Sequence, residues 1–282
     1  MELSLIAVPY HLGRPDVGAA RGPDRILRAV AGRRLELPEI RVAPSSPFTN
    51  EVAASMSVNA DLADRAGREL AGGRTPVTIS ADCFSCLGTL AALSAGAAIS
   101  TPRIGVVWLD AHGDFNTAAT SPTGYLDGMA LAAAVGLEWG TVAASISGFR
   151  PVDPSNVLHL GGRDFDPLEV ARLEDAGVLL IRPSELQAVT RQLEWTLASL
   201  AGRVDAVYVH LDLDVLDTSE GIANAYAAAG GLAVAELLDV VRACLAKLPV
   251  RAVGIAAYDP DFDPSGTIAS VGARLVEALA AG

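Results

Sequence analysis

Two mainly apolar stretches of the chain end in side chains that can bind metal ions. Each places those side chains at alternate positions: Asp110, His112 and Asp114 after residues 104–109, and Asp212 and Asp214 after residues 207–211. Buried strands carry such apolar runs, and burying polar side chains without partners costs several kcal/mol. Bound cations would offset that cost. The two stretches therefore predict a shared site for two divalent cations.

The expected position of these side chains follows from strand geometry. In an extended chain, alternate side chains point to the same face. If the strand continues beyond residue 109, then Asp110, His112 and Asp114 share one face. Ligands of an open α/β sheet bind outside the carboxyl ends of its strands. We therefore expect the metal site at that edge.

Strand-like and helix-like segments alternate along the chain and would position this site. The predicted strands cover residues 3–8, 39–42, 77–80, 104–110, 157–160, 178–181, 205–211 and 250–257. The predicted helices cover residues 22–30, 50–71, 86–96, 127–135, 168–175, 183–200, 234–247 and 265–281. This alternation indicates a three-layer α/β/α protein with a mainly parallel sheet. We interpret residues 1–282 as a single domain.

The composition narrows the class of protein. Hydrophobic residues make up 51% of the chain and the net charge is −12, which argues against nucleic acid or an anionic membrane as partner and suits a cationic substrate. No apolar run approaches the roughly 18–20 residues of a membrane span. The first residues lack the basic region of a signal peptide, so we expect a cytoplasmic protein. Three cysteines make no disulfide framework.

Five motifs, in this order, resemble those of the arginase/agmatinase (ureohydrolase) family. They are Gly22-Pro23 with Ile26, Leu27 and Arg28; Asp82-Cys83-Phe84-Ser85-Cys86-Leu87-Gly88; Asp110-Ala111-His112-Gly113-Asp114-Phe115-Asn116-Thr117; Gly162-Arg163-Asp164-Phe165-Asp166-Pro167; and Asp212-Leu213-Asp214-Val215-Leu216-Asp217. The resemblance covers most of the chain and implies an arginase-like fold. It also implies a small guanidino substrate and a homo-oligomer, either a trimer or a hexamer.

The resemblance assigns a ligand set to two cations, most often Mn²⁺. Asp110 and Asp212 would bridge the two ions. One ion would also take Cys83 and Asp114, and the other would take His112 and Asp214. Two such ions lower the pKa of a water held between them. Asp114 would orient that water for attack on a guanidinium carbon, and the reaction would release urea and an amine.

Three positions depart from the family pattern. Cys83 replaces a histidine ligand, and because thiolate is a softer ligand it favours Zn²⁺ or Fe²⁺ over Mn²⁺, with Co²⁺ a further candidate. Asp127 replaces a histidine that shuttles protons, a task that requires a raised carboxyl pKa. Ala257 replaces a glutamate that clamps the guanidinium. The metal pocket therefore resembles the family more closely than the substrate end does.

Further candidates have both a functional and a structural interpretation. Asn116 and Thr117 would bind a substrate carboxylate or hydrogen-bond within their loop, and Asp166 would contact a substrate amine. Asp127 is a proton relay or the N-cap of the next helix. His210 shares a face with Asp212 and is a candidate catalytic residue or a partner that supports the ligands. His11 and the segment 224–226 are expected near the pocket mouth.

These features favour a binuclear amidinohydrolase that cleaves a guanidine or a related amidine. One alternative is a hydrolase of a modified guanidine, such as an N-hydroxyguanidine. A second is a catalytically impaired pseudoenzyme of the same fold, motivated by the three substitutions. A deacetylase-type amide hydrolase fits less well, because that class uses one metal and needs fewer carboxylates than are present.

Overall fold

A parallel sheet of eight strands forms the centre of the protein in the computed structural model, which describes residues 1–44, 47–96, 102–186 and 191–282. The strands are β1 (Leu3–Val8), β2 (Glu39–Arg41), β3 (Thr75–Ser80), β4 (Ile104–Leu109), β5 (Val157–Leu160), β6 (Leu179–Ile181), β7 (Ala206–Asp212) and β8 (Val250–Ala256). Their order across the sheet is β2-β1-β3-β8-β7-β4-β5-β6, and every described pairing is parallel. The predicted α/β fold with a mainly parallel sheet is confirmed.

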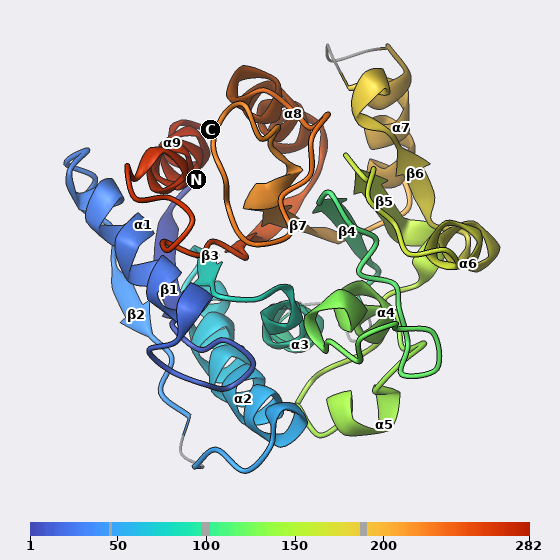
Figure 1. Ribbon diagram of the computed structural model, residues 1–282, viewed down its shortest axis with the longest axis horizontal. Coiled ribbons are helices and arrows are strands. Elements are labelled where there is room, and N and C mark those ends of the chain that lie inside the picture. Colours follow the sequence, from blue (N-terminus) through green and yellow to red (C-terminus); the bar gives the residue numbers. More distant parts are fainter. Residues whose placement is uncertain (45–46, 97–101, 187–190) are drawn as a thin grey trace.

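Helices cover both faces of this sheet (Figure 1). They are α1 (Gly22–Ala31), α2 (Glu51–Ala71), α3 (Cys86–Gly96), α4 (Ala130–Ala134), α5 (Gly140–Ala143), α6 (Glu169–Ala176), α7 (Arg191–Ala201), α8 (Val234–Lys247) and α9 (Thr267–Ala281). Helices α1, α7, α8 and α9 pack into one hydrophobic cluster, while α2, α3 and α4 pack into the other. The result is the predicted three-layer arrangement.

Local sequence explains the elements that lead to the site. Every residue of β3, β4 and β7 is buried, as expected of central strands in a parallel sheet. The Asn50 side chain caps α2 by accepting a hydrogen bond from the Ala53 amide at 2.9 Å. Helix α3 packs so closely on α2 that a Cβ at Gly88 would lie 2.6 Å from the Asn59 carbonyl oxygen. A glycine is therefore required at the centre of this helix contact.

The predicted boundaries differ from the structure at several points. The predicted helix over 183–200 is a short 3-10 turn, Pro183–Glu185, followed by α7, and residues 187–190 lie outside the described residues. Helix α5 was not predicted, because four residues are too few to show a helical pattern of apolar positions. Among the described residues, no helix is long and apolar enough to cross a membrane.

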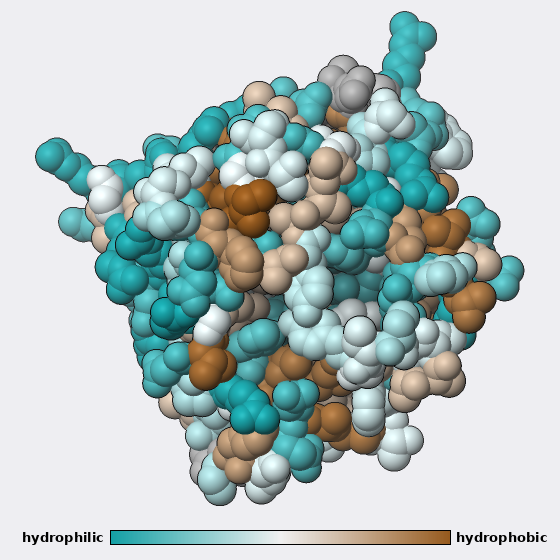
Figure 2. Space-filling model, viewed as in Figure 1, coloured by the Kyte–Doolittle hydropathy of each residue, from teal (hydrophilic) through white to brown (hydrophobic). Residues whose placement is uncertain are grey.

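The surface on the viewed side has no continuous apolar area. Figure 2 shows hydrophobic residues there in small separate groups between hydrophilic ones. Scattered exposed apolar side chains of this kind are ordinary on a folded protein.

Candidate metal centre

The predicted ligands converge on a cavity of about 390 Å³ at the carboxyl ends of four adjacent strands. Cys83 follows β3, Asp114 follows β4, Asp214 follows β7 and Ala257 follows β8, and all four line the cavity. The strands lie side by side in the order β3-β8-β7-β4. The structure thus brings these side chains together at the edge of the sheet where the metal site was predicted.

The extended conformation predicted for the first acidic stretch is wrong. Strand β4 ends at Leu109, and the chain then bends through Asp110 and His112. Asp114 adopts a left-handed backbone conformation with φ of 49°, which is uncommon for a residue other than glycine. In the second stretch, Asp214 lies in a 3-10 turn, Leu213–Val215, after β7 has ended. Turns rather than strand alternation thus aim these side chains.

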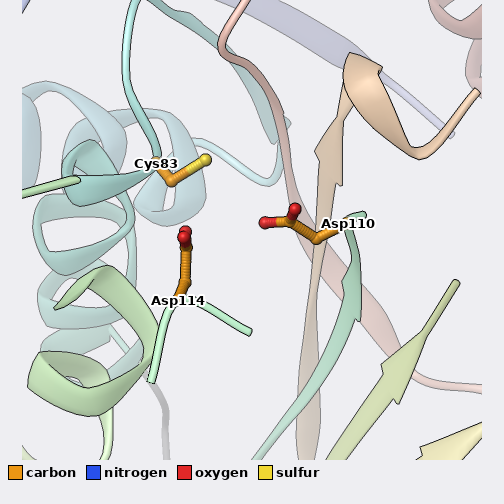
Figure 3. A group of neighbouring side chains, drawn as sticks. All are labelled: Cys83, Asp110 and Asp114. Atoms are coloured by element: carbon orange, nitrogen blue, oxygen red, sulfur yellow. The ribbon is translucent and has the colours of Figure 1, made fainter. Parts of the chain in front are cut away.

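One group of ligand-competent atoms consists of Cys83, Asp110 and Asp114. A ligand atom from each lies within 4.8 Å of the others, and all three residues are buried. Figure 3 shows their side chains pointing toward one another from the 3-10 turn before α3, the end of β4 and the following loop. The Cys83 thiol also donates a hydrogen bond to Asp212 Oδ2 at 3.0 Å. Asp212 thereby joins this group from β7.

A second group consists of Asp110, His112 and Asp214, again within 4.8 Å of one another. His112 Nδ1 lies 3.4 Å from Asp110 Oδ1 and 3.3 Å from Asp214 Oδ2. Asp110 belongs to both groups, so it lies where a bridging ligand is needed. The grouping matches the pairing of residues implied by the family resemblance.

Burial and crowding set the protonation of these groups. Burial, and next the Asp110 charge, raise the pKa of Asp114 well above its usual range, and burial also raises the pKa of the Cys83 thiol. Burial would likewise raise the pKa of Asp214, but His112 holds it down at about 2. Burial alone would lower the pKa of His112, yet Asp110 and Asp214 raise it.

The donor set fits a pair of divalent cations. Asp114 Oδ2 is buried and has no hydrogen-bond partner. His112 is the only cationic side chain that the described residues bring within 4.0 Å of this carboxylate cluster. Carboxylates crowded without compensating charge are strongly destabilising, and cations remove that cost. The thiol of Cys83 adds one soft donor to an otherwise hard set.

Neighbouring side chains hold the ligands in place. Trp108 Nε1 donates to Asp110 Oδ2 at 2.9 Å. Asp82 is not part of the cluster; its carboxylate accepts from the amides of Ser85 and Leu12 at 3.0 and 2.8 Å, which fixes the turn that presents Cys83. Partners of this kind orient metal ligands and tune their affinity.

Asp127 lines the cavity and is buried. Its carboxylate accepts a hydrogen bond from the Phe84 amide at 2.9 Å, and the N-cap of α4 is Met129. The alternative interpretation of Asp127 as the cap of the following helix is therefore wrong. Burial, together with the nearby Asp82 charge, raises the pKa of Asp127 well above the ordinary carboxyl value.

His210 does not line the cavity, so it is not placed to act as a catalytic residue, and it contacts the site through Trp108. Its ring is buried and stacks on Trp108 with 3.6 Å between ring centroids, and Nδ1 shares a 2.9 Å hydrogen bond with the Tyr208 hydroxyl. Burial lowers the pKa of His210 to about 3. Because β7 pairs with β4 so that His210 lies opposite Trp108, strand register places the ring in the core.

Of the three predicted substrate contacts, only Asp166 lines the cavity. Asn116 Nδ2 donates to Asp166 Oδ2 at 2.7 Å, and the Thr117 amide donates to Thr120 Oγ1 at 2.9 Å. Asn116 thus bonds across to the loop after β5, whereas Thr117 bonds within its own loop. The pattern identified the loop, but not which of its side chains face inward.

Arg163 holds main-chain segments around the site together. Its guanidinium donates to six main-chain carbonyl oxygens, those of Gly161, Asp214, Val215, Leu216, Ala228 and Ala229. Asp164 is exposed, and its carboxylate lies 3.9 Å from His112 Nε2. Arg163 therefore fastens the loop that carries Asp214.

Sequence reasoning missed several residues of the cavity wall. Ser121, Thr123, Tyr125 and Glu169 line the cavity without belonging to a recognised ligand pattern. His11 and Tyr226, expected near the pocket mouth, do line it. The turn residues before Tyr125, Pro122 and Gly124, were the only local signal that this loop folds back over the site.

Together, the fold and the clustered donors define an α/β protein with a candidate binuclear metal centre. The Arginase family model matches residues 1–282. The chain is 30% identical to the arginase of Bacillus caldovelox, over 98% of this chain and 97% of that protein. The structure of that arginase superposes with a TM-score of 0.86 at 27% identity, covering 99% and 98% of the two chains.

The same fold occurs in a formimidoylglutamase of Bacillus subtilis, with a TM-score of 0.79 at 17% identity over 98% of this chain and 84% of that one. The chain belongs to the Arginase family. The resemblance drawn from the motifs is confirmed.

Proposed function

We propose that this protein is a binuclear metal-dependent amidinohydrolase. It hydrolyses a C–N bond of a guanidino compound, or a related amidine, and releases urea or a urea analogue together with an amine. The supporting observation is the convergence of ligand-competent side chains from three loops on one cavity of an Arginase-family chain.

In this proposal, Asp110 and Asp212 would serve as ligands to both ions. Cys83 and Asp114 would hold one ion, and His112 and Asp214 would hold the other. Mn²⁺ is the expected ion, with Zn²⁺, Fe²⁺ or Co²⁺ favoured if the Cys83 thiolate binds. When bound, such a pair of ions lowers the pKa of water and stabilises developing negative charge.

The protein side chains then orient the reactants and carry the proton. The unpartnered Oδ2 of Asp114 accepts a hydrogen bond from the attacking water. Asp127, whose pKa is raised by burial, takes up the proton that the attacking water loses and passes it to the departing amine nitrogen as the C–N bond breaks. Asp166, oriented by Asn116, accepts from a substrate amino group. Thr117 fixes the loop that carries Asn116.

The test is a screen of guanidino compounds with protein loaded with Mn²⁺, Zn²⁺, Fe²⁺ or Co²⁺. Urea and amine are measured separately and should appear in equal amounts, while chelator-treated protein and Asp110→Ala should be inactive. Protein that holds two ions but hydrolyses no member of the panel would contradict the proposal. Protein that binds no ion, with unchanged stability in chelator, would favour the pseudoenzyme alternative.

A second candidate substrate class is favoured by Ala257. Its methyl group lines the cavity where the resemblance expects a guanidinium-binding carboxylate. A hydroxyl on a guanidine nitrogen withdraws electrons and weakens its basicity, so an N-hydroxyguanidine has less need of such a carboxylate. Including this class in the screen, with hydroxyurea as the second product to measure, separates the two candidates.

We also propose that the chain forms a homo-oligomer, a trimer or a hexamer, in keeping with the family resemblance. Sedimentation equilibrium of the metal-loaded protein measures this mass directly. A monomer at micromolar concentration would contradict the proposal.

A further inference from the structure

The wall of the candidate site contains a row of aromatic rings. The rings of Tyr226 and His112 form a T-shaped pair with 6.3 Å between their centroids. The ring of Tyr125 stacks on that of Tyr226 with 5.6 Å between their centroids. Tyr125 in turn shares a 2.9 Å hydrogen bond with His11 Nε2. The row thus runs from a candidate metal ligand to the rim of the cavity, and three different loops contribute to it.

Hydrogen bonds through Asn224 connect the main chain at Tyr226 to Asp214 and to Ala257. The Tyr226 amide donates to Asn224 Oδ1 at 2.8 Å. The amide group of Asn224 donates to Asp214 Oδ2 at 3.0 Å and to the Ala257 carbonyl oxygen at 2.9 Å. One buried side chain therefore couples the position of Tyr226 to a candidate metal ligand and to the back wall.

The cavity is chemically suited to a planar cation next to this ring. Seven of the described lining residues are acidic and none is lysine or arginine. The wall at Ala257 presents a methyl group, so no carboxylate is available there to pair with a guanidinium. Guanidinium groups stack on aromatic faces, and such contacts are strongest when shielded from water. Tyr226 is 55% exposed in the open cavity, which leaves its ring accessible.

We propose that Tyr226 is a substrate-contact residue that determines specificity for planar guanidine groups. Its ring packs against the plane of the guanidine, and Tyr125 supports it from behind. This inference rests on the proposed guanidine hydrolase function and adds the group that takes the place of the missing carboxylate at Ala257.

The test compares Tyr226→Phe, which keeps the ring, with Tyr226→Leu, which keeps only apolar bulk. Trp195→Leu is the matched control, because Trp195 is 73% exposed on α7 and does not line the cavity. For each metal-loaded variant, KM and kcat are measured for the guanidine that the wild type hydrolyses fastest. The dissociation constant of methylguanidine is measured by calorimetry, which is independent of turnover.

We expect Tyr226→Leu to raise KM and the methylguanidine dissociation constant by about 5- to 30-fold, the range of a partly shielded cation–π contact. Metal content and Tm should stay at the wild-type values, which excludes an indirect effect through Asn224 and Asp214. Tyr226→Phe and Trp195→Leu should remain within about twofold of wild type, since the ring is retained in one and remote in the other.

The outcomes separate this inference from the proposed reaction. If the wild type hydrolyses a guanidine and Tyr226→Leu leaves KM unchanged, the ring contact is wrong and the reaction stands. If the wild type hydrolyses none but binds methylguanidine in a Tyr226-dependent way, the contact stands and the reaction is wrong. Equal losses in Tyr226→Phe and Tyr226→Leu would assign the effect to the hydroxyl and overturn the inference. A wild type that neither binds methylguanidine nor hydrolyses a guanidine would overturn both the ring contact and the proposed reaction.

Discussion

Acidic side chains lie at both ends of β7 and at the carboxyl end of its neighbour β4, but the surroundings of the two ends differ. At the amino ends, Asp205 receives two hydrogen bonds from the Arg103 guanidinium, at 2.9 and 3.1 Å, on the exposed surface. At the carboxyl ends, Asp110 and Asp212 are buried, and His112 is the only cationic side chain that the described part of the chain brings close to the cluster.

The difference lies in how negative charge is balanced. At the amino ends, a protein side chain neutralises the acid in water, where an ion pair contributes little. At the carboxyl ends, even Arg163 donates its hydrogen bonds to carbonyl oxygens and not to the clustered carboxylates. A buried excess of negative charge that the protein leaves uncompensated is the expected property of a cation site.

The largest expected effect is that of Asp110→Asn. Asp110 belongs to both ligand groups, so its loss should abolish binding of both ions. We expect turnover to fall by more than about 100-fold, because even partners behind metal ligands contribute about 10- to 100-fold. Metal content per chain and kcat/KM measure this. Asp205→Asn, at the amino ends of the strands, is the matched control and should keep both ions. If Asp110→Asn also retained two ions, the carboxyl ends would not differ from the amino ends as a cation site.

The next effect concerns stability. Arg163→Met should destabilise the metal-free protein by at least about 3 kcal/mol, because each buried carbonyl left without a donor costs about 1–3 kcal/mol. Urea unfolding measures the loss. Arg242→Met is the control, since Arg242 pairs with Asp239 on the surface and should change stability by less than about 0.5 kcal/mol. Equal effects of the two variants would mean that the Arg163 bonds contribute no more than a surface pair.

Cys83 tests the chemistry of the buried end. Cys83→His replaces a soft donor with imidazole and should raise Mn²⁺ affinity about tenfold relative to Zn²⁺. Cys83→Ser, nearly the same size as the wild-type residue, should weaken binding of both ions. Competition titrations with the two metals measure the ratio. Weaker Mn²⁺ binding by Cys83→His would count against Cys83 as a ligand.

The smallest effect is expected at the amino ends. Arg103 holds the pKa of Asp205 at about 2, below the usual 3.8. A lowered pKa means that the folded form binds the proton less tightly than the unfolded form. The stabilisation is therefore present above about 3.8 and is lost as the pH falls through about 2.

The midpoints of urea unfolding of wild type and Asp205→Asn should differ slightly at neutral pH and should converge as the pH falls. A difference that grows as the pH falls would show that Asp205 acts through something other than its charge.

Much of the fold was predictable because its determinants are local. Continuous apolar runs identified the buried strands, and Asn50 and Gly22-Pro23 marked helix starts. The α8 boundaries, Val234–Lys247, match the prediction. The parallel arrangement followed from the alternation of elements, since parallel strands require crossover connections.

The sequence alone determined which residues stand at the ends of β4 and β7, because their spacing relative to apolar runs is a property of a short segment. Only the tertiary structure decided their contacts. The Cys83 thiol meets Asp212 across 129 residues of chain, Arg163 reaches the carbonyls of a distant loop, and Tyr226 lies beside His112. These pairings depend on sheet order and on turns such as the one at Asp114, which no local pattern encodes.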